Sequence, residues 1–206
     1  MSARLRLRTA RLYLVLDGAH AHVLDPALRG GVDVVQLRDK DLPDDELVRA
    51  ADRFRRLCDE HGALFVLNDR PDLVDACGAD GVHVGQSDAS VAEARAAVGD
   101  ERIVGLSIET EAQLDAVEGA DYLGVGAVFS TPTKTESVAG GLELVRAAAA
   151  RVTIPWFAIG GIDLSNVTEV AAAGAPGVAV VRAIRDADDP EAAARALQAA
   201  LPGRPL

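Results

Sequence analysis

The chain has 206 residues, of which 49% are hydrophobic and only 3% aromatic, and its formal net charge is −11. Because so acidic a surface repels polyanions, nucleic acid and anionic membranes are excluded as expected partners. The length is typical of one α/β barrel. We therefore expect a single domain over residues 1–206, with a core built mainly from Ala, Val, Leu and Ile.

The expected compartment is the cytoplasm. No apolar run approaches the ~18 residues that a membrane span needs, and Leu12–Leu16 is shorter than the apolar core of a signal peptide, which has about 7–15 residues. Cys58 and Cys77 lack metal-type spacing and are interpreted as buried small hydrophobic residues, which suits a reducing cytosol. Residues 1–11, which contain four arginines, are interpreted as a solvated lead-in to the first strand.

Short apolar runs alternate with longer amphipathic stretches along the chain. Strands are expected at Leu12–Leu16, Val32–Leu37, Leu64–Leu67, Gly81–Val84, Ile103–Leu106, Tyr122–Gly126, Trp156–Ile159 and Gly177–Val181. Helices are expected at Asp44–His61, Ala89–Ala97, Glu111–Val117, Leu142–Arg151, Asn166–Ala173 and Glu191–Ala200. This alternation predicts a parallel sheet. The count of eight favours a closed (β/α)₈ TIM barrel, with its active site at the C-terminal ends of the strands.

The second expected strand ends in residues 36–40, Gln-Leu-Arg-Asp-Lys. Because side chains alternate along a strand, Leu37 is expected to face the helices while Gln36, Arg38 and Lys40 face the barrel mouth. A solvated strand end is the alternative, but it does not explain a glutamine inside an apolar strand. A guanidinium beside an ammonium offers the planar fork and the point charge that a diphosphate requires.

Acidic residues follow the next two strands: Asp69 after the third and Asp88 after the fourth. Neighbouring strands lie about 4.8 Å apart, so these two carboxylates can share one ion. Oxygen ligands that leave room for water and phosphate oxygens predict Mg²⁺. Taken alone, Asp69 fits a capped turn equally well, and Asp88 in register favours the metal site. Asn68 is expected to donate to a phosphate oxygen.

Candidate anion contacts follow the fifth and sixth strands. Ser107 fits a helix N-cap, a phosphate contact or both. The residues after the sixth strand include Thr131, Pro132, Thr133 and Lys134. Because glycines follow them at positions 140 and 141, this segment predicts an anion-binding loop that closes over the site.

The last two strands predict a phosphate site. Loops after strands seven and eight of such barrels commonly bind phosphate through backbone N–H groups. Gly161 follows the seventh strand and allows close approach of the backbone. Val181 ends the eighth strand and Arg182 follows it. The pattern indicates a phosphorylated ligand and little more.

The four histidines form no Ser-His-Asp or Cys-His arrangement that the sequence reveals, and no side chain stands out as a general base. His83 is interpreted as a packed, hydrogen-bonded core residue rather than a ligand.

In its motifs the chain resembles the thiamin phosphate synthases over nearly its whole length. The matching stretches are residues 36–40, 68–70 (Asn-Asp-Arg), 81–88 (Gly-Val-His-Val-Gly-Gln-Ser-Asp), 131–134 (Thr-Pro-Thr-Lys) and 158–162 (Ala-Ile-Gly-Gly-Ile). Each is moderately specific, and the set in this order is highly specific. The resemblance implies a transferase of thiamin biosynthesis that joins hydroxymethylpyrimidine diphosphate to thiazole phosphate, or its carboxylate, with Mg²⁺ and releases pyrophosphate.

The resemblance also implies roles for individual residues. Substrate binding is expected at Gln36, Leu37, Arg38, Asp39, Lys40, Asn68, Ser107, Thr131, Pro132, Thr133, Lys134, Gly161, Val181 and Arg182. The expected catalytic groups are Arg38, Lys40, Ser107 and Lys134. Asp69 and Asp88 are the expected Mg²⁺ ligands. The implied mechanism is dissociative and needs no strong protein base.

Two departures from the family pattern and three alternatives remain. Glu109 stands where the family often has His, and Arg182 where Ser is common.

A related thiazole tautomerase relies on that His and lacks the acidic pair, so Asp69 and Asp88 favour the synthase. A regulatory barrel that only binds thiazole phosphate needs no metal–diphosphate site, and another phosphate-binding isomerase leaves residues 36–40 unexplained. The oligomeric state stays open, and a homo-oligomer is compatible with the sequence.

Overall fold

Eight parallel strands close into a barrel at the centre of the computed structural model, which describes residues 2–130 and 140–203. The strands are β1 (Leu12–Leu16), β2 (Val34–Leu37), β3 (Leu64–Asn68), β4 (Gly81–Val84), β5 (Ile103–Ile108), β6 (Tyr122–Val125), β7 (Trp156–Ile159) and β8 (Val178–Val180). Their order in the barrel follows the sequence, and β8 pairs with β1. The predicted TIM barrel is therefore confirmed, with strand ends that differ from expectation by one or two residues.

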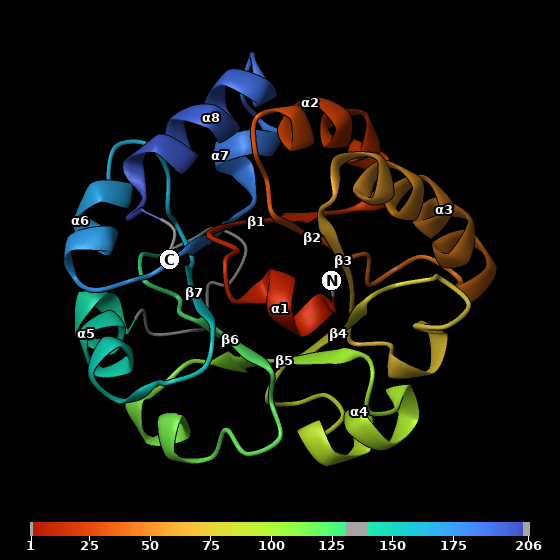
Figure 1. The fold of residues 1–206 in the computed structure, drawn as a ribbon, viewed down its shortest axis with the longest axis horizontal. Coiled ribbons are helices and arrows are strands. Elements are labelled where there is room, and N and C mark those ends of the chain that lie inside the picture. Colours follow the sequence, from red (N-terminus) through yellow and green to blue (C-terminus); the bar gives the residue numbers. More distant parts are fainter. Residues whose placement is uncertain (1, 131–139, 204–206) are drawn as a thin grey trace.

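Helices surround the barrel as an outer ring (Figure 1). The α-helices are α1 (Ala3–Leu7), α2 (Leu24–Arg29), α3 (Asp44–His61), α4 (Val91–Val98), α5 (Gly141–Arg151), α6 (Val167–Ala172), α7 (Arg182–Arg185) and α8 (Pro190–Ala200). Short 3₁₀ helices are η1 (Gly18–Val23), η2 (Pro71–Leu73) and η3 (Glu111–Asp115). The α-helix expected over Glu111–Val117 is thus a shorter 3₁₀ turn, and α1, α2 and α7 were not expected, because each is too short to show a clear apolar period.

Alternation along the strands divides the buried side chains into two separate clusters. Outward residues such as Leu14, Leu37 and Val104 pack against the helices in the larger cluster. Inward residues such as Val34, Leu64 and Ile103 fill the barrel in the smaller one. This is the pattern expected of parallel strands that are covered on both faces. The barrel is therefore a packed core at one end, and its polar inward residues lie at the other.

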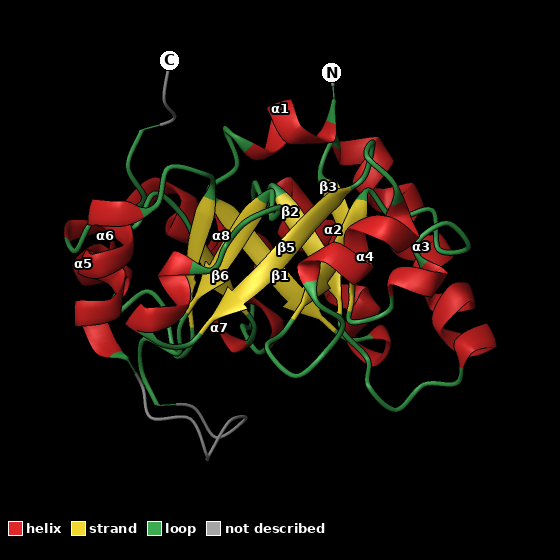
Figure 2. Cartoon of the chain, turned by 90° about the horizontal axis from the view of Figure 1, so that it is seen from below, coloured by secondary structure: helices red, strands yellow, loops and turns green. Residues whose placement is uncertain are grey.

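The packed end is closed by α1, which lies across the openings where the strands begin (Figures 1 and 2). Leu7 is only 1% exposed and belongs to the inner cluster. Arg4 donates to the Asp121 carboxylate at 2.7 Å, and Arg6 donates to the carbonyl of Gly62 at 2.7 Å. The solvated lead-in expected for residues 1–11 is therefore only partly right. Ser2, Leu5 and Arg8 are exposed, but Arg4 and Arg6 hold a short helix whose buried Leu7 plugs the barrel.

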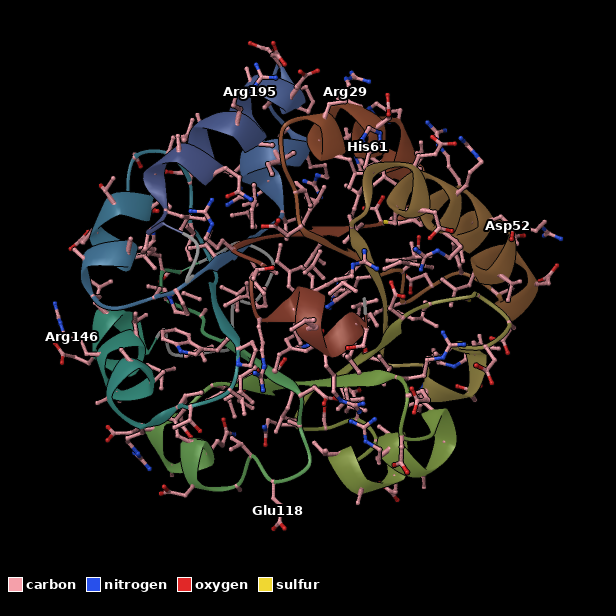
Figure 3. The ribbon with its side chains drawn as sticks, in the orientation of Figure 1. Arg29, Asp52, His61, Glu118, Arg146 and Arg195 are labelled. Carbon is pink, nitrogen blue, oxygen red and sulfur yellow. The ribbon has the colours of Figure 1, made fainter. Side chains whose placement is uncertain are left out.

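Charged side chains gather on the outer rim of the helix ring. Figure 3 shows Arg29, Asp52 and Glu118 pointing away from the barrel, and all three are exposed. None of the helices that the structure describes combines the length and apolar character of a membrane span.

The plug predicts a stability effect that is separate from catalysis. Leu7→Ala should lower the free energy of unfolding by about 2–4 kcal/mol, because it removes buried methyl groups and leaves a cavity. Leu5, on the same helix but 51% exposed, provides the matched control, and Leu5→Ala should change stability by less than about 0.5 kcal/mol. Urea unfolding of both variants measures this, and equal losses would contradict a plugging role for Leu7.

Candidate active site

A cavity of about 900 Å³ lies at the end of the barrel where the strands finish. Residues that follow all eight strands line it. They include Asp17, Gln36, Arg38, Lys40, Asn68, Asp69, Asp88, Ser107, Glu109, Gly126, Gly161, Val181 and Arg182. Active sites of TIM barrels form at this end because the loops that follow the strands converge there. The structure thus brings together most of the residues that the sequence singled out.

The end of β2 places polar and apolar side chains on opposite sides, as alternation predicts. Gln36, Arg38 and Lys40 line the cavity. Leu37 is fully buried against the helices, so its side chain lies away from the cavity and only its backbone faces the barrel mouth. Asp39 also lies outside the cavity, where it accepts a hydrogen bond from the Gly18 N–H at 3.3 Å. No carboxylate pairs with Arg38 among residues 2–130 and 140–203.

Two carboxylates meet at the rim of the cavity. Burial and the neighbouring charge of Asp88 raise the pKa of the Asp69 carboxyl, while Lys40 acts in the opposite direction. The Lys40 Nζ lies 3.3 Å from Asp69 Oδ2, and this ammonium is 54% exposed. A single exposed ammonium contributes little in water. Among the described residues, the charge of the acidic pair is therefore only partly balanced, by the single ammonium of Lys40.

The backbone at Asp69 has an unusual conformation. Its φ is +59°, the only positive value among the described non-glycine residues. The Arg70 N–H donates to the Asn68 carbonyl at 2.8 Å, which closes a γ-turn around Asp69. The Asp69 N–H donates to the His83 carbonyl at 2.8 Å and ties this turn to β4. Arg70 also forms hydrogen bonds with both carboxylate oxygens of Asp44, at 2.6 and 2.9 Å. The strained turn is thus held from two sides.

The donor set at this rim fits a hard divalent cation. Two carboxylates would occupy a minority of the six octahedral positions of Mg²⁺ and leave the others to water and ligand oxygens. The described residues contain no cluster of three or more acidic, histidine or cysteine side chains that could hold a metal alone. Asp69 and Asp88 thus offer two of the oxygen donors that such a cation accepts.

Ser107 lies deeper in the cavity and contacts a histidine. The His83 Nε2 lies 3.0 Å from Ser107 Oγ, and the His83 Nδ1 lies 3.1 Å from the Tyr122 hydroxyl. The Gln86 side chain donates to the Ser107 carbonyl at 2.6 Å. His83 is only 9% exposed, so its interpretation as a hydrogen-bonded core residue is confirmed. It also lines the cavity, and its pairing with Ser107 is one that the sequence did not reveal.

The ends of β7 and β8 form the opposite wall. Gly161 has φ +66°, and a Cβ at this position would lie 2.8 Å from the Phe129 Cβ. Only glycine therefore fits between these loops without a shift of the backbone. Val181 and Arg182 follow β8, where Arg182 begins the short helix α7, and both line the cavity.

The remaining candidate residues after β6 are not placed. Thr131, Pro132, Thr133 and Lys134 lie outside the described residues. Glu109, the position where the family often has His, lines the cavity, and its backbone N–H donates to the Gln113 side chain at 2.7 Å.

Sequence reasoning missed several residues that line the cavity. Tyr13 and Tyr122 lie on its floor, and Asp17, Asp163 and Arg185 lie on its rim. A signal was present, because Tyr13 and Asp17 alternate with the outward leucines of β1. Applying the β2 alternation to every strand would have found Tyr13, Asp17 and Tyr122, but not Asp163, which lies beyond β7, or Arg185, which lies in α7.

The repulsion within the acidic pair predicts that the metal-free protein becomes more stable when one of the two carboxylates is removed. In metal-free protein, Asp69→Asn should raise the free energy of unfolding by on the order of 1 kcal/mol, because it removes a half-buried charge from beside Asp88. Asn tolerates positive φ, whereas Ala at this position should be less stable than Asn by about 1–2 kcal/mol. Denaturant unfolding of the three proteins tests both statements. Equal stability of all three would contradict the repulsion and the backbone strain.

Comparison with known proteins gives one family. The model of the thiamine monophosphate synthase family matches residues 12–184. The thiamine-phosphate synthase of Thermobifida fusca is 48% identical over 204 residues, which cover 95% of this chain and 94% of that protein. The thiamine-phosphate synthase of a Nostoc species is 47% identical over 188 residues, which cover 89% of this chain and 54% of that longer protein.

A solved structure agrees with the sequence relatives. The thiamine phosphate pyrophosphorylase of Pyrococcus furiosus superposes with a TM-score of 0.87 at 34% identity, covering 95% of this chain and 96% of that one. Both the family match and the identities extend over nearly the whole barrel, cavity walls included. The chain therefore belongs to the thiamine monophosphate synthase family and is an enzyme of the transferase class.

Proposed function

We propose that this enzyme couples hydroxymethylpyrimidine diphosphate to thiazole phosphate, or its carboxylate, in a Mg²⁺-dependent reaction that releases pyrophosphate. The observation that carries the proposal is the meeting of Arg38 and Lys40 with Asp69 and Asp88 at the rim of one cavity. Cations alone suit any phosphate. An acidic pair beside them suits a metal–diphosphate complex, because a metal cation would attract both the two carboxylates and the diphosphate oxygens and so offset the repulsion between them.

Asp69 and Asp88 would hold the metal. When bound, Mg²⁺ would neutralise charge on the diphosphate oxygens and make the diphosphate a better leaving group. Arg38 offers a planar fork of N–H donors to those oxygens, and Lys40 offers a point charge. Asn68 and Ser107 line the same side of the cavity and provide neutral donors. Lys134, which lies outside the described residues, is proposed as a further cation.

The proposed chemistry moves two electron pairs. The bond between the pyrimidine methylene carbon and the diphosphate oxygen breaks, and its electrons leave with the diphosphate. The resulting cation is stabilised by the amino group of its own ring. The lone pair of the thiazole nitrogen then forms the new C–N bond, which gives thiamin phosphate and pyrophosphate. With thiazole phosphate no proton moves in either step, which agrees with a site that offers cationic and hydrogen-bonding groups rather than a strong base. The carboxylate would in addition release CO₂ after coupling, and the ring carbon that keeps the electron pair would take up one proton from water.

The walls of the cavity suit such a reactive intermediate. Val15, Phe157 and Ile159 contribute apolar surface near the floor. A dry wall limits capture of the cation by water. Gly161, Val181 and Arg182 on the opposite side are proposed to bind the phosphate of the thiazole, which directs its ring nitrogen toward the centre of the cavity.

The thiazole tautomerase is the main alternative activity. That activity relies on a histidine at the position of Glu109, and it makes no use of an acidic pair. The presence of Asp69 and Asp88 at the rim supports coupling with diphosphate departure instead.

The direct test incubates the chain with both substrates and Mg²⁺ and measures thiamin phosphate and pyrophosphate together. Asp69→Asn should lower kcat/KM by about 100-fold or more, because it removes electrostatic stabilisation that acts on the leaving group. Asp75→Asn is the matched control, since Asp75 is 82% exposed in an ion pair with Arg102 far from the cavity. It should leave kcat/KM within about twofold.

Folded wild-type protein that forms no thiamin phosphate would overturn the proposed function. The metal would instead be removed from the proposal by either of two results. One is product formation that is equally fast in EDTA, and the other is a kcat/KM of Asp69→Asn equal to that of the wild type.

A further inference from the structure

A chain of hydrogen bonds crosses the interior of the barrel beneath the cavity. Gln36 Nε2 donates to the Tyr13 hydroxyl at 2.8 Å. The hydroxyls of Tyr13 and Tyr122 lie 2.9 Å apart. The Tyr122 hydroxyl contacts His83 Nδ1 at 3.1 Å, and the His83 Nε2 contacts Ser107 Oγ at 3.0 Å. We refer to these five residues as the buried relay. Its two ends, Gln36 and Ser107, both line the cavity.

The sheet makes room for the buried relay with two glycines. Gly105 on β5 is the register partner of His83 on β4 and of Tyr122 on β6. A Cβ on Gly105 would lie 2.5 Å from the Tyr122 hydroxyl and 2.1 Å from its ring, which no real structure allows. Gly124 similarly leaves space for the His83 ring, whose Cε1 would lie 3.3 Å from a Cβ there. The missing side chain of Gly105 is what lets His83 and Tyr122 meet across an intervening strand.

The burial of the relay makes its hydrogen bonds obligatory. Tyr13 and Tyr122 are 2% and 0% exposed, and Gln36 is 4% exposed. Desolvation raises the pKa of both phenols, so both keep their protons at neutral pH. A buried polar group without a partner costs roughly 1–3 kcal/mol. Each phenol therefore has one proton to donate. Because the surrounding interior has a low dielectric constant, that proton needs a hydrogen-bond acceptor.

The direction of every bond follows from the Gln36 end. An amide nitrogen can only donate, so the Tyr13 oxygen accepts from Gln36 and its own proton goes to Tyr122. Among the residues that the structure describes, the Tyr122 proton then has one acceptor left, which is His83 Nδ1. An acceptor at Nδ1 places the imidazole proton on Nε2, where it donates to Ser107 Oγ. The Ser107 hydroxyl proton is thereby turned away from His83 and toward the cavity.

We propose that the buried relay of Gln36, Tyr13, Tyr122, His83 and Ser107 fixes the neutral Nε2–H tautomer of His83 and thereby presents the Ser107 hydroxyl to the cavity as a donor to an anionic substrate. Tyr122 and His83 are positioning residues in this scheme, because they act through Ser107. The same polarity prevents His83 from removing the Ser107 proton, so it excludes a covalent role for this serine. The proposal rests on the proposed function where it identifies the anion as the diphosphate.

The first experiment reads the tautomer without turnover. In protein labelled with ¹⁵N-histidine, long-range ¹H–¹⁵N spectra distinguish Nε2–H from Nδ1–H, and His83→Gln identifies the signals of His83. The wild type should show the Nε2–H form. Tyr13→Phe should keep that form, because Tyr122 still donates to Nδ1, whereas Tyr122→Phe should give a mixture of tautomers. An Nδ1–H or doubly protonated His83 in the wild type overturns the proposal.

The second experiment is a kinetic double-mutant cycle. Tyr122→Phe should lower kcat by about tenfold, the loss expected of one hydrogen bond to a charged group, while the KM for thiazole phosphate stays unchanged. Tyr13→Phe is the matched control, one link further from Ser107, and should lower kcat less than about threefold. In a Ser107→Ala background, Tyr122→Phe should have no further effect on kcat, because the hydroxyl that it positions is gone.

The outcomes separate the two proposals. If the wild type makes no thiamin phosphate, the proposed function fails while the tautomer measurement still decides the relay. The wild type could be active while the loss of kcat in the double variant equals the product of the losses in Ser107→Ala and Tyr122→Phe. In that case the relay does not act through Ser107 and this inference is wrong. If Tyr122→Phe fails to fold, His83→Gln replaces it in the cycle, with the same expectation of no added effect on Ser107→Ala.

Discussion

Closure of eight parallel strands is the constraint on which the rest of this structure depends. Once β8 pairs with β1, each strand residue faces either the helices or the barrel interior. A polar group that is sealed in the interior needs a hydrogen-bond partner, because an unpaired polar group there is costly. The chain meets this constraint by dividing the interior along its axis. Leu7 and an apolar layer fill one end, hydrogen-bonded tyrosines form the middle, and the ionisable groups are confined to the open end.

The open end concentrates opposite charges in a protein that is acidic overall. Arg38 and Lys40 supply local positive charge at the cavity, while Asp69 and Asp88 form a negative pair that the described residues balance only in part, through Lys40. Asp69 also has a strained backbone. Strain and repulsion of this kind persist only where the surrounding structure enforces them. Under the proposed function, a metal and a diphosphate would complete this arrangement.

Much of this was predictable from short-range patterns. The alternation of Leu37 with Gln36 and Arg38 correctly assigned the faces of β2. The packing of α1 was not predictable, because four arginines in eleven residues read as a solvated segment, and only the tertiary partners Asp121 and Gly62 show why they hold a helix. The hydrogen bond between His83 and Tyr122 was missed for a similar reason. It depends on Gly105, whose missing side chain lets these two residues meet across β5.

The central claim is that the acidic pair and the cations at the strand ends form one metal–diphosphate site. The most direct measurement is calorimetric titration of the chain with inorganic pyrophosphate, with and without Mg²⁺, in wild type and in Asp88→Asn. The account predicts one tight binding event that requires Mg²⁺ and is weakened by about tenfold or more in Asp88→Asn. Binding of equal strength in EDTA, or binding that Asp88→Asn leaves unchanged, would contradict it.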